Sequence, residues 1–213
     1  MTSQRPKKQK DGLRKILKLL ERKQKRKHRG TYTKNFFPID VIYDPQSFTE
    51  KLFSKLCKGK GKKKEVRGEP ALLVLRLVAK LIGRHKLLIS QFFSYANHLI
   101  KQKNKEVGKL LACIAEACHE NLQREDVKDI IGTIVDNLVS EHCPPEFITM
   151  GLNTVREIAL RMPQVLDKDE LSYLVQFREY KNKYVGIAAK SLINLYRDVN
   201  PDLLPKKFKY VNW

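Results

Sequence analysis

The sequence lacks the features by which secreted, membrane-spanning and mainly β-sheet proteins are recognised. Its N-terminus has no apolar core of a signal peptide. The longest apolar stretch, residues 71–83, is interrupted by Arg76 and Lys80 and is too short to span a bilayer. No segment shows the convincing alternation of apolar and polar residues that is typical of a strand. Without a secretion signal, the four cysteines are expected to be reduced, as in the cytosol or nucleus.

Motifs for catalysis and for cofactor binding are also missing. The chain has no G-x-S-x-G elbow, no H-E-x-x-H motif and no paired-carboxylate signature. The segment KGKGKKK at 58–64 lacks the spacing of a phosphate-binding loop, and no strand is predicted before it. It is either a flexible loop that contacts RNA or a solvated linker. We therefore predict a protein that is not an enzyme, with no cofactor and no small-molecule substrate.

Two pairs of neighbouring ligands, Cys118-His119 and His142-Cys143, raise the question of a zinc site. Neighbouring residues on a helix point about 100° apart, so they cannot easily share one metal ion. Cys113 and Cys118 also lie in a stripe of small and apolar residues. We expect no metal site, and we expect these two cysteines to pack as compact apolar side chains.

Acidic residues are scarce beside basic ones. The 213 residues include 43 Lys and Arg against 23 Asp and Glu, which gives a formal net charge of +20. Residues 1–70 hold 22 basic and 7 acidic residues, whereas residues 71–213 hold 21 and 16. This asymmetry predicts a folded body preceded by a basic segment. A charge of this sign and size favours binding to an anionic polymer.

The first basic segment, residues 1–34, is expected to be an arm. Residues 1–10 are polar and are expected to be disordered, and a helix is predicted at 12–29 with Asp11 as its cap. Cations cover more than one face of that helix, so phosphate contacts would neutralise them and release counterions. Together with lysines of the 58–64 loop, the residues predicted to bind RNA phosphates are Arg14, Lys15, Lys18, Arg22, Lys23, Lys25, Arg26, Lys27, Arg29, Lys60, Lys62, Lys63 and Lys64.

Other interpretations of this cationic arm remain open at this stage. KKQK at 7–10 and RKQKRKHR at 22–29 also fit a nuclear import signal that binds no RNA. A helix lying on a membrane surface is less favoured, because Leu13, Ile16, Leu17 and Leu20 form too small an apolar face for stable anchoring.

A second region, residues 35–65, is predicted to hold an extended segment, one helix and the basic loop. Residues 35–43 are aromatic and β-branched with Pro38 inside, which favours an extended chain. Asp44-Pro45 then predicts a helix start, with Phe48, Leu52 and Leu56 on one face of that helix.

Residues 66–208 are predicted to form a domain of helical repeats. Seven apolar stripes at helical spacing begin at Leu72, Leu87, Val107, Val127, Phe147, Leu171 and Val185, and Gly83 is expected to close the first. A two-helix unit recurs about every 35–40 residues, as in HEAT or armadillo repeats. We therefore predict an all-α, HEAT/armadillo-like helical-repeat solenoid with a basic N-terminal helix; an irregular helical bundle is the alternative.

Three segments carry a family resemblance: FFPIDVIYDPQSFTEKLFSKL at 36–56, MGLNTVREIALRMP at 150–163, and ELSYLVQFREYKNKYVGIAAKSLINLYRDVNPDLLPKKF at 170–208. The chain resembles the SDA (Severe Depolymerisation of Actin) family of nucleolar proteins over about residues 35–208. Members of that family are longer, with a helical-repeat region before this part and a charged tail after it. In that family, too, a lysine-rich segment precedes the aspartate–proline helix.

The resemblance implies a non-enzymatic scaffold for assembly and export of the large (60S) ribosomal subunit. The implied partners are pre-ribosomal RNA, ribosomal proteins and pre-60S assembly factors in the nucleus and nucleolus, with no membrane. The alternative is a nuclear protein-protein adaptor, related to transport or to the actin cytoskeleton, whose basic arm is only an import signal. No residues here resemble an actin site.

The C-terminal residues add a further basic region. Cations at 179–183 (EYKNK), Lys190 and Arg197 are expected on an outer ridge, where they are either solvated or in contact with RNA or an acidic partner. Phe208, Tyr210 and Trp213 follow two lysines and could stack on bases. We favour the other interpretation, in which these aromatic residues dock the tail onto the last helix.

Overall fold

The computed structural model describes residues 38–58, 69–101 and 106–209. The chain divides into two compact units, residues 1–42 and 43–213. The predicted helix at 12–29 lies outside the described residues. In the first unit the described element is a single 3-10 helix, η1 (Pro38–Val41). This corrects our prediction of an extended chain there, because proline at the first position of a helical turn has a suitable φ and lacks only an N–H that would be unpaired anyway.

The described part of the second unit is helical throughout, which confirms the predicted all-α class. It contains no strand, and no described helix is long and apolar enough to cross a membrane. The elements are α2 (Pro45–Lys58), α3 (Glu69–His85), α4 (Ser90–Lys101), α5 (Val107–Ala117), α6 (Arg124–Leu138), α7 (Pro145–Arg161), η2 (Pro163–Val165), α8 (Lys168–Gln176), η3 (Phe177–Glu179), α9 (Lys183–Val199), η4 (Pro201–Leu203) and α10 (Lys206–Lys209).

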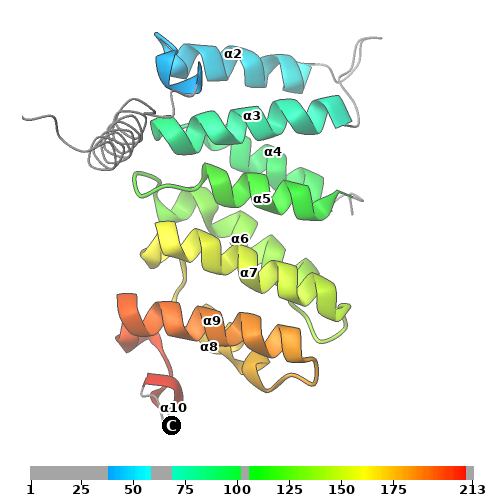
Figure 1. Cartoon of the computed structure of the whole chain (residues 1–213), viewed down its shortest axis with the longest axis vertical. Helices are drawn as coiled ribbons and strands as arrows, with labels where there is room; N and C mark the ends of the chain where they lie inside the picture. The colour runs from blue at the N-terminus through cyan, green and yellow to red at the C-terminus, as the bar shows by residue number, and fades with distance from the viewer. Residues whose placement is uncertain (1–37, 59–68, 102–105, 210–213) are drawn as a thin grey trace, which may run out of the picture. The chain divides into compact units, whose positions relative to one another are not determined.

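The helices of this unit pack in two layers (Figure 1). In one layer α2 packs on α3, α3 on α5, α5 on α7, and α7 on α9. Behind them α4 packs on α6, and α8 packs on α9. Between the layers, α4 packs on α5, α6 on α7 and α8 on α9. This is the pattern of stacked helix pairs in HEAT-type repeats, and it confirms the predicted repeat architecture.

The predicted stripes largely form the core between the layers. Every residue of the stripes that begin at Val107, Val127, Leu171 and Val185 is buried, including Ile114, Ile134 and Leu192, which are fully inaccessible. In the stripe that begins at Phe147, Val155, Ile158 and Ala159 are buried as predicted, but Phe147 is 39% exposed and Ile148 is buried in its place.

Helix α2 begins as predicted but turns a different face inward. Asp44 caps it by accepting a hydrogen bond from the Ser47 N–H (3.1 Å), and hydrogen bonds from Ser47 lower the pKa of that carboxyl. The predicted face was wrong for Phe48, which is 44% exposed, whereas Thr49 and Phe53 are buried with Leu56. The Phe53 ring packs against α4, with its centroid 6.2 Å from that of Phe92 and 5.7 Å from that of Tyr95.

Gly83 does not close α3, contrary to our prediction. The helix continues to His85 and ends where Lys86 adopts a left-handed backbone (φ 52°), with the Leu87 N–H bonded to the Ile82 carbonyl. Gly83 instead permits a close approach of α5. A Cβ at this position would lie 2.0 Å from the carbonyl oxygen of Glu116. The glycine is therefore required by helix packing, which the sequence pattern alone does not reveal.

Candidate nucleic-acid interface

The thirteen cations predicted to bind RNA lie in residues 1–37 and 59–68, outside the described residues. The structure therefore leaves their role a prediction. What it does describe is how the remaining charges are distributed over the helical body.

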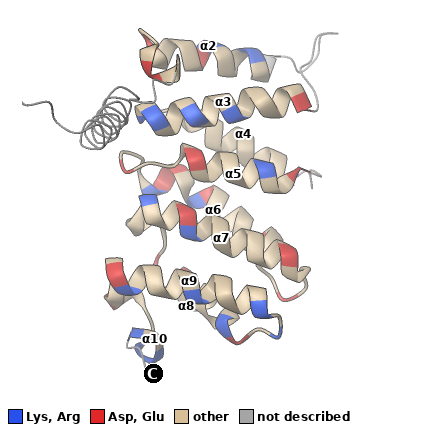
Figure 2. Ribbon diagram, in the orientation of Figure 1, with Lys and Arg blue, Asp and Glu red and all other residues tan. Residues whose placement is uncertain are grey.

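Charge is unevenly divided along that body. Residues 71–175 contain thirteen Lys and Arg and thirteen Asp and Glu, whereas residues 176–213 contain eight and three. We call these two segments the middle and the C-terminal end. Figure 2 shows basic and acidic positions mixed over the middle helices, and basic positions in the loop before α9 and in α10. Within residues 71–213, the excess positive charge thus belongs to the C-terminal end.

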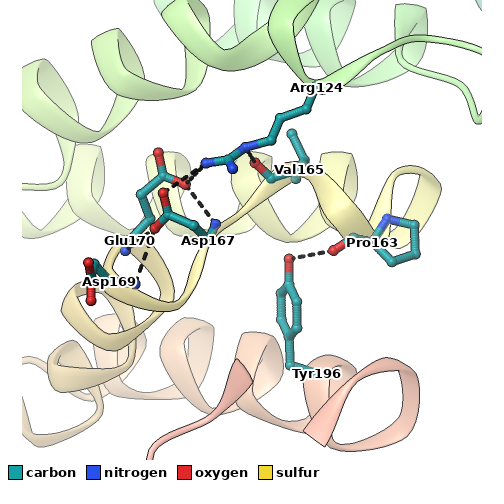
Figure 3. A network of polar contacts seen from close by, with 7 residues as sticks. All are labelled: Arg124, Pro163, Val165, Asp167, Asp169, Glu170 and Tyr196. Atoms are coloured by element: carbon teal, nitrogen blue, oxygen red, sulfur yellow. Dashed lines mark hydrogen bonds and ion pairs between the residues drawn. The ribbon is translucent and has the colours of Figure 1, made fainter. Parts of the chain in front are cut away.

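In the middle, Arg124 is used to join two helices (Figure 3). Its guanidinium lies 2.8 Å from an Asp167 carboxylate oxygen and 3.2 Å from one of Glu170, and its Nε donates to the Val165 carbonyl (3.2 Å). Arg124 is the first residue of α6, and the two carboxylates belong to the N-terminus of α8. The arginine therefore connects elements that are more than forty residues apart in the chain.

The two carboxylates also cap α8. Asp167 accepts hydrogen bonds from the N–H groups of Asp169 (3.1 Å) and Glu170 (2.8 Å), and Glu170 accepts one from the Asp167 N–H (2.9 Å). The backbone bond from Glu170 and the bond from Arg124 lower the pKa of Asp167, and the bond to Asp167 raises the pKa of Arg124. The D-x-x-E spacing in the sequence indicates the cap, but no local pattern identifies Arg124 as its partner.

Other cations of the middle also face carboxylates. Lys109 lies 2.8 Å from Glu106, Lys80 lies 3.9 Å from Glu116, and Lys86 pairs with Glu120. These side chains are largely exposed, so each pair contributes little to stability. Their consequence is electrostatic, because neighbouring opposite charges cancel at a distance and leave the middle a weak attractor of polyanions.

The C-terminal end retains several lysines without such neighbours. Lys209 pairs with Asp202 (2.9 Å) and Lys207 lies 3.9 Å from Glu179. Four further lysines are exposed and form no ion pair with the described residues: Lys181, Lys183, Lys190 and Lys206. We call these four the end lysines. Exposed lysines without a carboxylate neighbour are suited to contact with phosphate.

The last residues of the described chain dock onto α9. Phe208 is buried, the guanidinium of Arg178 lies 5.5 Å from its ring centroid, and Arg197 donates from Nε to the Phe208 carbonyl (2.7 Å). For Phe208 this confirms the predicted docking, while Tyr210 and Trp213 lie outside the described residues. It also corrects our placement of Arg197 on an outer ridge, since its guanidinium holds the C-terminal segment in place.

The cysteine and histidine neighbours at the end of α5 are packed inside the body. Cys113 and Cys118 are both buried, as predicted, and burial raises the pKa of the Cys118 thiol to about 12. His119 is also buried, with its Nε2 atom 3.0 Å from the Leu87 carbonyl oxygen. His119 therefore joins the loop after α5 to the loop after α3.

Two layers of stacked helix pairs define the class of this chain as a helical-repeat protein. The chain belongs to the SDA1 family: residues 1–181 match the family described as "SDA1, HEAT repeat". It is 38% identical over 192 residues to "Protein SDA1 homolog" of Nematostella vectensis, covering 90% of this chain and 27% of that protein. It is 34% identical over 209 residues to "Protein SDA1" of Chaetomium thermophilum, covering 98% and 27%. The chain thus spans about a quarter of the length of these relatives.

Proposed function

We propose that this chain is a non-enzymatic scaffold in the assembly and export of the large (60S) ribosomal subunit. Membership of the SDA1 family over most of the chain is the observation that carries this proposal. The chain would act in the nucleus and nucleolus, where it would hold pre-ribosomal RNA, ribosomal proteins and pre-60S assembly factors in a defined geometry.

The helical body supports the scaffold part of this proposal. Its helices bury continuous apolar stripes between two layers, so neighbouring repeats stabilise one another and present extended outer surfaces. Contacts such as that of Arg124 with Asp167 hold successive repeats together. A nearly neutral middle suits contact with other proteins, because a high charge of one sign would repel most of them.

Charge supports the RNA part of the proposal. Residues 1–70 hold fifteen more basic than acidic residues, and the predicted contacts from Arg14 to Lys64 all lie within them. Lysine and arginine bind phosphate without reading base sequence, so these contacts would position the protein on RNA that other factors select. We propose no contacts of these residues with base edges in either groove of the RNA.

The experiment is a salt series with purified protein and a pre-ribosomal RNA transcript. We compare the full chain, a form lacking residues 1–34, and a variant in which Lys60, Lys62, Lys63 and Lys64 are changed to Gln. Each lost phosphate contact should reduce the slope of log K against log salt by about 0.7 to 0.9. We expect a steep slope for the full chain, a much flatter one after deletion, and a smaller reduction for the loop variant.

A matched control removes the same number of charges from the middle of the body, through Lys80→Gln, Lys86→Gln, Lys109→Gln and Lys128→Gln. We call these four the middle lysines, and their replacement should leave the slope within about one unit of wild type. Equal affinity of the full chain and the form without residues 1–34 would instead favour the protein-protein adaptor, whose arm serves only nuclear import. Because binding is measured in vitro, loss of import cannot imitate loss of RNA contact.

A further inference from the structure

A cleft of about 760 Å³ lies at the C-terminal end of the body, which is within the usual size range of ligand pockets. Its lining comes from the start of α7, the end of α8, η3, the turn before α9, and α10. Three aromatic residues, Tyr173, Phe177 and Tyr180, line it together with Lys181 and Lys207. Aromatic rings and lysines therefore meet in one concave site.

The rings form a fixed platform. The Phe177 centroid lies 5.5 Å from that of Tyr173 and 5.9 Å from that of Tyr180, with interplanar angles of 81° and 31°. Phe177 is buried, and the Tyr173 hydroxyl donates a hydrogen bond to the Val139 carbonyl (2.9 Å). The Tyr180 N–H is bonded to the Phe177 carbonyl (3.2 Å). A ligand would thus stack on rings whose positions are already set, which lowers the entropic cost of binding.

The charges around this platform favour an anionic ligand. Lys181 is one of the end lysines, and the Lys207 side chain is 59% exposed although it lies 3.9 Å from Glu179. Glu141 and Glu179 also line the cleft, so the two lysines of the lining are balanced by two glutamates. The surrounding segment decides the sign, because residues 176–213 hold five more basic than acidic residues. A cationic ligand would have to approach through this positive potential.

We propose that this cleft binds one unpaired RNA nucleotide, with its base stacked on Tyr180 and its phosphate beside Lys181. Every base has a flat π face, so such a site accepts unpaired RNA without reading its sequence. A base-paired nucleotide does not present that face, so the cleft would discriminate between single strands and duplexes. The proposal extends the proposed function, in which phosphate contacts are made by residues 14–64, and it adds a second contact at the other end of the chain.

The test uses the full chain and a short single-stranded RNA oligonucleotide, with a duplex of the same sequence for comparison. Tyr180→Ala should weaken single-strand binding about tenfold, as expected for the loss of one stacking ring, and should leave duplex binding unchanged. Tyr180→Phe keeps the ring and should stay within about twofold of wild type. The matched control is Tyr184→Ala, which removes a tyrosine that is 71% exposed on α9 and does not line the cleft.

Salt dependence separates stacking from phosphate contact. Tyr180→Ala should weaken binding equally at every salt concentration, because stacking releases no counterions, whereas Lys181→Gln should reduce the slope by about 0.7. If Tyr180→Ala perturbs folding, detected as a lowered Tm, the slope of Lys181→Gln still tests the proposal.

Three results would overturn the proposal: unchanged single-strand affinity in folded Tyr180→Ala, an unchanged slope in Lys181→Gln, or tighter binding of a peptide carrying trimethyl-lysine. The last would mean that the rings and Glu141 form a cage for a cation instead. Failure of the proposed function would look different. In that case the form lacking residues 1–34 would keep full RNA affinity, whatever the Tyr180 variants do.

Discussion

The middle and the C-terminal end of the body are made of the same kind of helix, but they use their charges in different ways. The middle has as many acidic as basic residues, and Arg124, Lys80, Lys86 and Lys109 all face carboxylates. The C-terminal end has eight basic and three acidic residues, and its four end lysines form no ion pair with the described residues. In the middle, Arg124 joins two helices and the lysines are paired locally, whereas the end lysines are available to a partner.

Burial explains part of this difference. The Arg124 side chain is 29% exposed and its guanidinium has three acceptors, because a partly desolvated cation is costly without partners. Exposed lysines carry no such penalty, since water solvates them and their flexible stems keep their entropy. The comparison therefore predicts that substituting Arg124 changes stability and that substituting the end lysines changes RNA affinity.

The largest expected effect belongs to the middle. Gly83→Ala should lower the free energy of unfolding by about 3 kcal/mol, because the new Cβ would lie 2.0 Å from the Glu116 carbonyl oxygen and would force α3 and α5 apart. Urea unfolding followed by circular dichroism measures this change. RNA affinity of the protein that remains folded should be unchanged, since neither helix carries a proposed RNA contact.

Gly132 provides the matched control, because it also lies inside a helix but a Cβ there would meet no atom within 4 Å. Gly132→Ala should therefore stabilise the protein by about 0.5 to 1 kcal/mol through helix propensity. If both substitutions raised the free energy of unfolding, helix propensity, and not the close approach of α5 to α3, would determine the effect of Gly83→Ala.

A smaller loss of stability is expected from Arg124→Ala. This change leaves Asp167 and Glu170 as adjacent carboxylates without their shared cation, and it leaves the Val165 carbonyl without its donor. We expect a loss of about 2 kcal/mol in urea unfolding, typical of charged hydrogen bonds at a partly buried site. Lys109→Ala breaks a more exposed pair and should cost less than about 0.5 kcal/mol. If Arg124→Ala and Lys109→Ala lowered the free energy of unfolding equally, the contacts of Arg124 between α6 and α8 would contribute no more than an exposed ion pair.

Periodicity was sufficient to predict most of the core. The stripes in α5, α6, α8 and α9 are buried throughout because each lies between two layers, so its apolar face coincides with its buried face. The buried face of α2 was harder to predict, because two faces of this helix are compatible with helical spacing. One face holds Phe48, Leu52 and Leu56, and the other holds Thr49 and Phe53. The structure buries Phe53 because α4 supplies two aromatic neighbours, which no local pattern contains.

Features that depend on contacts between distant residues could not be predicted from the sequence. Gly83 looks like a helix terminator until α5 is placed against it, and the partner of Arg124 lies 43 residues away in the chain. The rings of Tyr173, Phe177 and Tyr180 are close in sequence, but the cleft that they line also includes Pro145 of α7 and Lys207 of α10, which local spacing does not reveal. The cationic residues from Arg14 to Lys64 were predicted from local composition alone, and they remain a prediction because they lie outside the described residues.

The smallest expected effect in free energy compares the two segments directly. Changing the end lysines Lys181, Lys183, Lys190 and Lys206 to Gln should weaken RNA binding about fivefold, about 1 kcal/mol, and reduce the salt slope by up to about 3. The same number of changes at the middle lysines should reduce the slope by less than one unit, because three of those lysines already face carboxylates. Both variants should unfold within about 0.5 kcal/mol of wild type, since all these side chains are exposed. Equal slopes for the two variants would mean that RNA responds to the net charge of the whole chain, and the contrast between the two segments would then have no part in binding.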